Sequence, residues 1–459
     1  MADEVAQFEA AHPRSKALFE RATRSLLGGV PMSWMVKWAG PYPVFVEEAT
    51  GAHFRCVDGH DYVDFCLGDT GAMTGHSPEE AVAGIAAQLV RGLTTMLPGE
   101  DAIEVGEELQ RRFGLALWQF TLTATDANRF ALRLCRQITG RPYVLVFDHC
   151  YHGSVDESFA TLRDGVVGPS DGSIGPAVDP RLTTKVVQWN DIAALEAALA
   201  PGDVAAVLAE PVMTNVGIVH PEPGYHDALR RITRETGTLL IIDETHTLCA
   251  GPGGYTRAEG LDPDILTIGK AIGSGIPAGA FGLSQVVADR ILAANDDLEV
   301  IDMGGVGGTL AGNALSLAAI RTTLANVLTE ANFARMIPLG ERWTSGVQAG
   351  IDEFGVPWHV SRLGCRAEYL FRTQLPRNGA EAAQGMDFEL QQYMHLHALN
   401  RGILLTPFHN MALIAADTTE ADVDYHTHVF REAGRYIVTL TANGSDRVAK
   451  IVDIANNGP

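Results

Sequence analysis

The sequence predicts an α/β protein with a large domain, built on a mainly parallel seven-stranded sheet, and a smaller α+β domain. Short, continuously apolar runs bounded by turn residues have the length and composition of strands buried on both faces of a sheet. Helical patterns separate several of these runs, and this alternation favours parallel strands covered by helices. From about Glu330 onward the alternation stops, and the pattern becomes that of a smaller α+β unit.

Residues 1–65 are expected to form an N-terminal segment that belongs to the small domain. A helical pattern runs from about Ser15 to Leu27 and is stopped by Gly28 and Gly29. Farther on, turn residues punctuate three short runs that have the composition of strands. These antiparallel strands are predicted at residues 45–47, 53–55 and 62–65.

The large domain is predicted over residues 66–329 and begins with two helices, at about 81–91 and 101–113. The seven expected strands are residues 120–122, 143–147, 185–188, 204–209, 239–242, 265–268 and 280–283. The helices expected between them are residues 127–139, 191–200 and 225–236. A long helix over residues 313–328 is expected to lead out of this domain.

Residues 330–459 are predicted to form the C-terminal small domain. A helical pattern opens this part of the chain, and two strands are expected at about 358–361 and 366–372. A final helix is expected to begin around Glu420.

Composition argues against several classes of partner. The chain has 34 lysines and arginines against 56 acids, a formal charge of −22 and a pI near 5.0. Nucleic acid and anionic membranes attract basic surfaces, so neither is expected as the main partner. No apolar run is long enough for a membrane span, and residues 1–15 lack the apolar core of a signal peptide. Six cysteines without a CxxC pair are typical of thiols in a reducing cytoplasm, which is the expected location.

An acid and an amine follow two of the apolar runs. Asp243 comes directly after the run at 239–242, and Lys270 follows Gly269 after the run at 265–268. The ligand crevice of an open α/β sheet lies at the carboxyl ends of its strands, so the two side chains are expected to face one ligand. Lys270 is one of only five lysines in the chain. In this apolar, glycine-rich setting it is either a desolvated nucleophile suited to Schiff-base chemistry or a solvated residue in a turn.

Three further stretches could bind a phosphate or a ring. Residues 121–128 lie between a strand and a helix, where backbone N–H groups bind anions; capping by Thr125 or Asp126 is the alternative. The glycine-rich stretch 304–309 has neither a P-loop ending nor the dinucleotide pattern. Residues 151–153, which read Tyr-His-Gly, place an aromatic ring just after a strand, where packing is the alternative.

The order of these motifs resembles that of the class III pyridoxal-phosphate aminotransferases. The motifs are the threonine-rich helix start, Tyr-His-Gly, Glu-Pro, Asp-Glu, Lys and Gly-Thr. That family includes glutamate-1-semialdehyde aminomutase, and the resemblance extends from about Gly28 to the final helix. It implies a fold type I pyridoxal-phosphate-dependent transferase. It also implies pyridoxal 5′-phosphate as the cofactor, and an assembly that is at least a homodimer.

The resemblance also assigns roles to residues. Lys270 would hold the cofactor as a Schiff base and shuttle a proton, while Asp243 would keep the pyridine nitrogen protonated, which makes the ring an electron sink. Tyr151 would stack on the ring, with Thr245 on its opposite face. The other implied cofactor contacts are Ala124 and Thr125 in the phosphate cup, His152, Glu210, and Thr309, which would reach the phosphate of the neighbouring subunit.

Two departures from the family pattern concern the cofactor. The family's cup usually reads Ser-Gly-Thr-Glu-Ala, whereas residues 123–127 here read Thr-Ala-Thr-Asp-Ala. Ala124 fits this cup provided that its φ is not positive. The usual Asp-Glu-Val becomes Asp-Glu-Thr at residues 243–245, and His246 follows, which adds polar groups near the ring.

A third departure concerns the substrate. The aminomutase places an arginine for the substrate carboxylate shortly after its Gly-Gly-Val, and residues 28–35 here contain none. Trp34, Met35 and Trp38 indicate an apolar mouth instead, or they pack in the core. The candidate replacement anchors for a carboxylate are Arg366, which is favoured, Arg163 and His409.

The sequence therefore favours an aminotransferase that moves an amino group from a primary amine, or a β- or ω-amino acid, to a keto acid such as pyruvate. The alternatives are an intramolecular aminomutase of the glutamate-1-semialdehyde type and a pyridoxal-phosphate-dependent lyase, because one scaffold hosts several pyridoxal chemistries. A non-enzymatic ligand-binding protein is disfavoured because Lys270 and Asp243 are both present.

Overall fold

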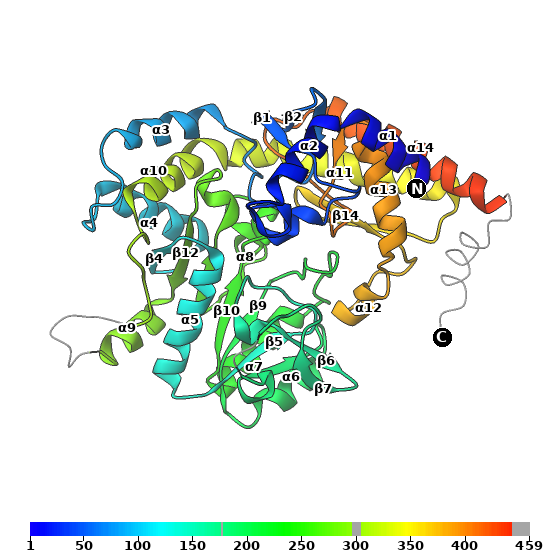
Figure 1. Ribbon diagram of the computed structural model, residues 1–459. Coiled ribbons are helices and arrows are strands. Elements are labelled where there is room, and N and C mark those ends of the chain that lie inside the picture. Colours follow the sequence, from blue (N-terminus) through cyan, green and yellow to red (C-terminus); the bar gives the residue numbers. More distant parts are fainter. Residues whose placement is uncertain (176–177, 296–303, 443–459) are drawn as a thin grey trace. The chain divides into compact units, whose positions relative to one another are not determined.

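The computed structural model describes residues 1–175, 178–295 and 304–442 (Figure 1). The chain forms two compact units. The large unit consists of residues 79–330 and 376–384, and the small unit consists of residues 1–78, 331–375 and the chain from 385 onward. No helix in the described parts of the chain is both long enough and apolar enough to cross a membrane.

A seven-stranded sheet forms the centre of the large unit, with the strand order β4-β12-β11-β10-β9-β5-β8. Strands β8, β5, β9, β10 and β11 run parallel, and β12 is antiparallel to both β11 and β4. The predicted mainly parallel sheet of seven strands is confirmed. Its strands are β4 (Leu117–Thr121), β5 (Tyr143–Phe147), β8 (Thr184–Val187), β9 (Val204–Ala209), β10 (Leu239–Asp243), β11 (Ile265–Ile268) and β12 (Gly279–Leu283).

Helices pack on this sheet because its inner strands are apolar on both faces. All six residues of β9 are buried, and Ala131 and Cys135 of α5 pack in one core cluster with residues of β5, β9, β10 and β11. The helices of the large unit are α3 (Glu79–Leu89), α4 (Glu100–Phe113), α5 (Ala124–Thr139), α6 (Ile192–Leu199), α7 (Tyr225–Thr236), α8 (Gly254–Ala258), α9 (Gln285–Ala293), α10 (Ala314–Thr322) and α12 (Gly379–Ala383). A hairpin, β6 (Ala160–Arg163) and β7 (Val166–Pro169), was not expected from the sequence.

The long helix expected over residues 313–328 is interrupted. Helix α10 ends at Thr322, and Thr323–Val327 forms a π-helical turn. The buried Arg112 guanidinium on α4 binds this turn, because Nη2 donates to the Leu324 carbonyl and Nη1 to the Leu328 carbonyl, each at 2.7 Å. Carbonyls that the wider turn leaves without helical partners are thus satisfied by a side chain.

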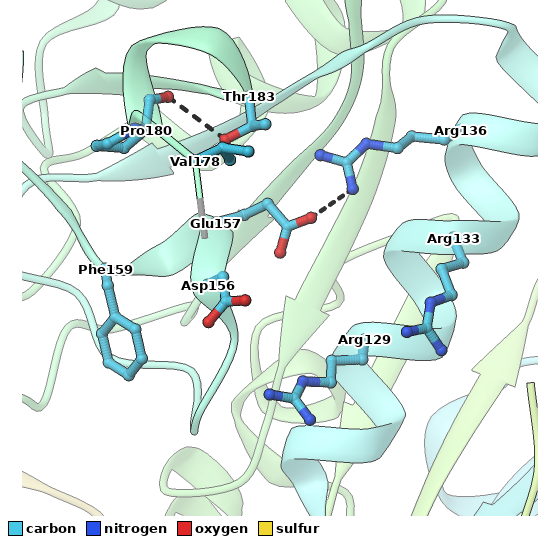
Figure 2. Close-up of a pocket in the computed structure, with 9 residues that line it drawn as sticks. All are labelled: Arg129, Arg133, Arg136, Asp156, Glu157, Phe159, Val178, Pro180 and Thr183. Atoms are coloured by element: carbon cyan, nitrogen blue, oxygen red, sulfur yellow. Dashed lines mark hydrogen bonds and ion pairs between the residues drawn. The ribbon is translucent and has the colours of Figure 1, made fainter. Parts of the chain in front are cut away.

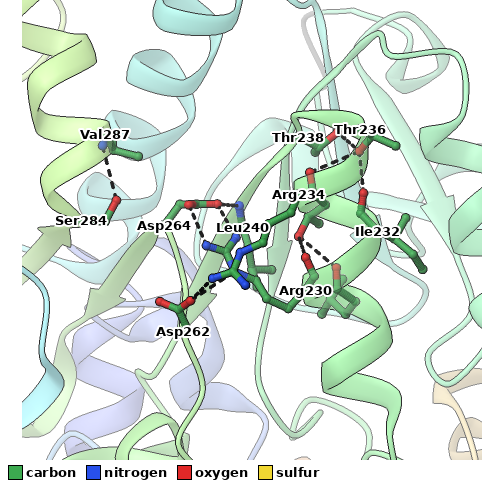
Figure 3. A network of polar contacts seen from close by, with 12 residues as sticks. Arg230, Ile232, Arg234, Thr236, Thr238, Leu240, Asp262, Asp264, Ser284 and Val287 are labelled. Atoms are coloured by element: carbon green, nitrogen blue, oxygen red, sulfur yellow. Dashed lines mark hydrogen bonds and ion pairs between the residues drawn. The ribbon is translucent and has the colours of Figure 1, made fainter.

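Polar contacts fix the amino-terminal ends of β10 and β11 (Figure 3). Asp264, just before β11, accepts two hydrogen bonds from Arg230 of α7, at 2.7 and 3.0 Å. The same carboxylate accepts the Leu240 N–H of β10 at 2.8 Å. Asp262 lies beside it and pairs with Arg234. Because these contacts join the starts of two neighbouring parallel strands, they also hold the register at the opposite, carboxyl ends.

One sheet of the small unit combines strands from the N-terminal and C-terminal parts of the chain. Strands β1, β2 and β3 form antiparallel pairs, and β15 pairs in parallel with β3. A second sheet has the order β13-β14-β16. The strands are β1 (Val46–Thr50), β2 (His53–Cys56), β3 (Asp61–Asp64), β13 (His359–Leu363), β14 (Arg366–Leu370), β15 (Ile403–Leu404) and β16 (Met411–Leu413). The helices are α1 (Ala2–Ala11), α2 (Pro13–Ala22), α11 (Glu330–Phe354), α13 (Phe388–Leu399) and α14 (Glu420–Ala442).

The first two helices of the small unit differ from the prediction. Helix α2 ends at Ala22, five residues before the predicted end at Leu27, and the chain continues through a short 3₁₀ turn in which Gly28 has φ +69°. Helix α1 was not expected from the sequence, although Asp3 and Glu4 in its first turn suit a helix N-terminus. Its buried Phe8 lies in a small-unit core cluster with Tyr42, Phe54 and Leu396.

Candidate active site

Two neighbouring strands bring the predicted acid and amine to one edge of the large sheet. Strands β10 and β11 are parallel, with Asp243 paired to Thr267 in the register. Asp243 ends β10, and Lys270 lies two residues beyond the end of β11 at Ile268. Both side chains therefore leave the carboxyl ends of adjacent strands.

Lys270 is held close to the start of helix α5. It has φ +50°, in the left-handed region, and begins a 3₁₀ turn. A Cβ at the preceding residue, Gly269, would lie 2.9 Å from both the Cβ and the N of Ala124. Only glycine permits this close approach, so the local sequence Gly-Lys positions the lysine against the α5 N-terminus.

The Asp243 carboxylate is buried and accepts three hydrogen bonds. Its Oδ2 accepts from Asn128 Nδ2 at 2.8 Å and from His152 Nδ1 at 2.9 Å, and its Oδ1 accepts the Thr245 N–H at 3.0 Å. Burial acts to raise the pKa of Asp243, but the bonds from His152, Thr245 and Asn128 lower that pKa to about 2. Burial lowers the pKa of His152, yet Cys150 and Asp243 raise it, and the net shift is upward. The result is a buried carboxylate that stays ionised at neutral pH.

Asn128 is a site residue that the sequence did not reveal. Its side chain is fully buried on α5, and its Oδ1 accepts from Thr267 Oγ1 of β11 at 2.7 Å. Its Nδ2 donates to the His152 carbonyl at 3.1 Å as well as to Asp243. One amide thus joins α5, β11 and the Tyr-His-Gly loop around the carboxylate. The only signal for it in the sequence is its position one helical turn after Ala124.

Helix α5 begins within the stretch that was predicted to bind a phosphate. The helix begins at Ala124, three residues earlier than predicted, and Ala124 is not among the residues with positive φ. The condition for an alanine in the cup therefore holds. The alternative interpretation, capping by Thr125 or Asp126, is wrong, because the N-cap is Thr123, whose Oγ1 accepts the Asp126 N–H at 3.1 Å.

Thr125 packs against the Tyr-His-Gly loop. Its Oγ1 accepts the Ser154 N–H at 3.1 Å. Gly153 has φ +78°, and a Cβ there would lie 2.1 Å from Thr125 Oγ1. Gly153 is thus required for two reasons: its φ is positive, and a side chain there would clash with Thr125. Tyr151 is half-buried, with its ring centroid 6.5 Å from that of Phe159.

Three more predicted residues lie in the large unit. Glu210 follows β9, is buried, and accepts the Thr214 N–H at 3.2 Å; burial raises the pKa of its carboxyl. Thr245 is buried next to Asp243. Thr309 is exposed in the loop before α10. One contact was not predicted: Lys270 Nζ lies 2.7 Å from His246 Nε2.

The predicted substrate residues Trp34 and Arg366 lie in the small unit. The Trp34 ring lies edge-on to Phe408, with centroids 5.7 Å apart. Arg366 is fully buried on β14, with Nη2 3.4 Å from Glu368 Oε2. Glu368 also contacts His409 Nδ1 at 2.9 Å, so Arg366 and His409 share one carboxylate partner within the fold. The third candidate, Arg163, is exposed and paired with Asp171.

The segment that lacks the arginine lines an apolar cavity of about 550 Å³ in the small unit. Val30, Pro31, Met35 and Trp38 are among its lining residues. Asp64 and His76 also line it, and they contact each other at 2.8 Å. The lining of this cavity is therefore mainly hydrophobic.

A second, smaller cavity of about 250 Å³ lies beside α5 in the large unit (Figure 2). Arg129, Arg133 and Arg136 project into it from one face of the helix. Each arginine has a partner in the fold: the Ser154 carbonyl, the Gly305 carbonyl and the Glu157 carboxylate, respectively. These arginines hold the loops next to the cup, and none of the predicted site residues lines this cavity.

Comparison with known proteins adds four similarities. Residues 34–416 match the family model described as aminotransferase class-III. The chain is 33% identical over 431 residues to glutamate-1-semialdehyde 2,1-aminomutase 2 of Halalkalibacterium halodurans, covering 92% of this chain and 97% of the relative. A glutamate-1-semialdehyde-aminomutase structure from Pseudomonas aeruginosa has TM-score 0.92 and 49% identity, covering 94% and 96%. An omega-transaminase structure from Sphaerobacter thermophilus has TM-score 0.82 and 29% identity, covering 92% and 97%.

Proposed function

Because the chain belongs to the class III aminotransferases, we propose that it moves an amino group from a primary amine, or a β- or ω-amino acid, to a keto acid such as pyruvate. The enzyme depends on pyridoxal 5′-phosphate, whose ring supplies an electron sink for the reaction. The observation that carries the substrate class is the segment at residues 28–38, which contains no arginine to bind a substrate carboxylate and is rich in apolar residues.

The residues at the sheet edge fit the ring of this cofactor. A carboxylate has about four acceptor positions, and described residues fill three of them at Asp243. One position is thus left for the proton on a pyridine nitrogen. We propose that the Asp243 carboxylate accepts a hydrogen bond from the protonated ring nitrogen and so keeps the proton there. His152 and Asn128 would orient Asp243, and Glu210 would lie beside the ring. Tyr151 and Thr245 would cover the two faces of the ring.

The start of α5 fits the phosphate group. The N–H groups of Ala124 and Thr125 lie in the first turn of the helix, where donors have no partner within the helix. The Thr125 hydroxyl accepts from Ser154, which leaves its proton for an anion. We propose this turn as the phosphate site, with Thr309 of a second copy as a further contact.

Lys270 is the proposed catalytic residue. Its amine would hold the cofactor covalently until a substrate amine takes its place. The released Nζ would then carry the proton to and from the substrate carbon. Its place at the start of a rigid 3₁₀ turn, packed against Ala124, keeps the amine at the strand edge throughout.

A substrate panel tests the proposal. The holoenzyme is given pyruvate with an aryl-alkylamine, a β-amino acid with an apolar substituent, or glutamate-1-semialdehyde, and alanine formation is measured. The first two donors are expected to exceed the semialdehyde in kcat/KM by about tenfold or more, because apolar pocket contacts discriminate by ~1–3 kcal/mol. Faster turnover of the semialdehyde, without net transfer to pyruvate, contradicts the proposal.

An aminomutase is the second candidate, and the relatives named above favour it. Such an enzyme returns the amino group to the same carbon skeleton, so no alanine accumulates with pyruvate. A lyase would instead release ammonia from the donor in the absence of any keto acid. The same panel therefore separates the three activities when three products are measured. Alanine indicates an aminotransferase, isomerised semialdehyde an aminomutase, and ammonia a lyase.

A homodimer is the proposed assembly. Large apolar side chains are exposed between α3 and α4, including Val90 at 88%, Met96 at 74% and Leu97 at 76%. The Ala314 N–H donates to the Leu93 carbonyl at 2.9 Å, which ties this segment to the loop that carries Thr309. A second copy that covers this apolar segment would meet the same loop, and so could receive Thr309 in its phosphate site.

Replacing Leu97 with aspartate tests this assembly. We expect light scattering to show monomers and the retained cofactor to fall, because an uncompensated charge in a buried interface opposes association. Leu182→Asp is the control, since Leu182 is also exposed, at 66%, but belongs to another part of the unit. A Leu97→Asp protein that remains dimeric would remove this surface from the proposed interface.

A further inference from the structure

His246 contacts the proposed catalytic lysine directly. Its Nε2 lies 2.7 Å from Lys270 Nζ, which is within hydrogen-bond distance. His246 follows β10 and Lys270 follows β11, so the contact joins the ends of two adjacent parallel strands. The sequence indicated only that His246 adds a polar group near the ring, and gave it no role.

The turn that carries His246 is fixed by a buried carboxylate. Glu244 is fully buried, and accepts from Thr247 Oγ1 at 2.5 Å and from the N–H groups of Tyr255 and Thr256 at 3.1 and 2.5 Å. The Leu248 N–H donates to the Glu244 carbonyl at 3.0 Å. These bonds hold both flanks of His246, so its ring is presented to Lys270 by a rigid turn.

A contact this short limits the protons that the pair can carry. Two cations at hydrogen-bond distance repel each other, so the imidazole and the amine are not both charged. Either the ammonium donates to a neutral imidazole, or an imidazole N–H donates to a neutral amine. The ionisable groups on the strand ends and turns of this sheet edge include Asp126, Asp148, His149, Cys150, Tyr151, His152, Glu210, Asp243 and Glu244.

We propose that His246 is a positioning residue for Lys270, which orients Nζ and accepts the proton that leaves it. A lysine amine is a nucleophile and a base only when it is neutral. A neighbouring imidazole can take that proton near neutral pH and return it, because histidine is the side chain that titrates there. This inference rests on the proposed role of Lys270. It also assigns a function to His246, which follows the Asp-Glu-Thr that replaces the usual Asp-Glu-Val of the family.

The test uses the holoenzyme of three variants. His246→Ala removes the acceptor, and His246→Gln keeps an oxygen acceptor that cannot take up a proton. His220→Ala, at an exposed histidine of the same unit, is the control. Borohydride reduction and peptide mapping first establish that each variant still carries the cofactor on Lys270.

The first readout is the pH dependence of the cofactor's absorbance without substrate. An acceptor beside Nζ favours its protonated form, so His246→Ala is expected to lower the titration midpoint by about one pH unit, a tenfold change. His246→Gln is expected to shift it less, and the control not at all. A His246→Ala midpoint equal to that of the wild type overturns the orienting role.

The second readout is the single-turnover rate with an amine donor. Both His246 variants are expected to react about 10- to 100-fold more slowly, within the range for a lost proton carrier. Added imidazole should restore part of the rate in His246→Ala, but not in the wild type. Wild-type rates in both variants overturn the proton-holding role. If the wild-type enzyme transfers no amino group at all, the proposed function fails, while the absorbance titration still decides the contact with Lys270.

Discussion

Replacement of Lys270 with alanine is expected to lower kcat/KM by about 10²- to 10⁴-fold, the range for loss of a positioned proton carrier. The variant also loses the amine that would hold the cofactor, so its absorbance should become that of loosely bound cofactor. The structure favours this lysine for geometric reasons. Its Nζ contacts His246 at 2.7 Å, and its backbone packs against the α5 N-terminus through Gly269.

Borohydride reduction checks the assignment independently of activity. In the wild-type protein, the label should map to the peptide that contains Lys270, and Lys270→Ala should incorporate none. Lys16→Ala is the matched control, because Lys16 is about half-exposed and pairs with Glu9 on the surface of the small unit. A label on one of the other four lysines would contradict both the site and the role proposed for Lys270.

The inner strands of the large sheet were the most predictable part of the fold. Strands β5, β9 and β11 have the predicted bounds. They are almost wholly buried, so an apolar run marks their entire length. The edge strand β4 was predicted at 120–122 but spans Leu117–Thr121, because its exposed residues interrupt the apolar pattern. Helix propensity could not reveal the π-helical turn after α10. Carbonyls in and just after this turn accept hydrogen bonds from Arg112, which is more than 200 residues away in the sequence.

The site was predictable where it follows from strand order alone. Parallel strands place their carboxyl ends on one edge, so Asp243 and Lys270 could be assigned together from two apolar runs. Asn128 could not be assigned, because its contacts with Asp243 and Thr267 span more than a hundred residues of sequence. The pairing of His246 with Lys270 likewise depends on the turn after β10, which Glu244 holds in place.

Asp243→Asn should retain the cofactor yet lower kcat by at least about 100-fold, because a neutral amide cannot hold a proton on the ring nitrogen. Burial opposes ionisation of Asp243, but three hydrogen bonds lower its pKa to about 2, so the wild-type carboxylate is charged at any working pH. A group with a depressed pKa stabilises the fold above its unfolded value and loses that contribution as pH falls towards 2. The loss of activity in Asp243→Asn should therefore be the same across neutral pH.

A matched control separates the electron-sink role of Asp243 from the general cost of altering a buried carboxylate. Asp148 is also buried after a parallel strand, and accepts from Thr161 Oγ1, the Leu162 N–H and Gln188 Nε2 at 2.6, 2.9 and 2.7 Å. Asp148→Asn should lower the melting temperature, since lost hydrogen bonds to a buried charge cost about 1.5–3 kcal/mol, while kcat changes little. Asp243→Asn should lower kcat even in molecules that remain folded and loaded with cofactor. Near-normal turnover of such molecules would assign the proton on the ring to another residue, and equal losses of kcat in both variants would reduce Asp243 to a structural carboxylate.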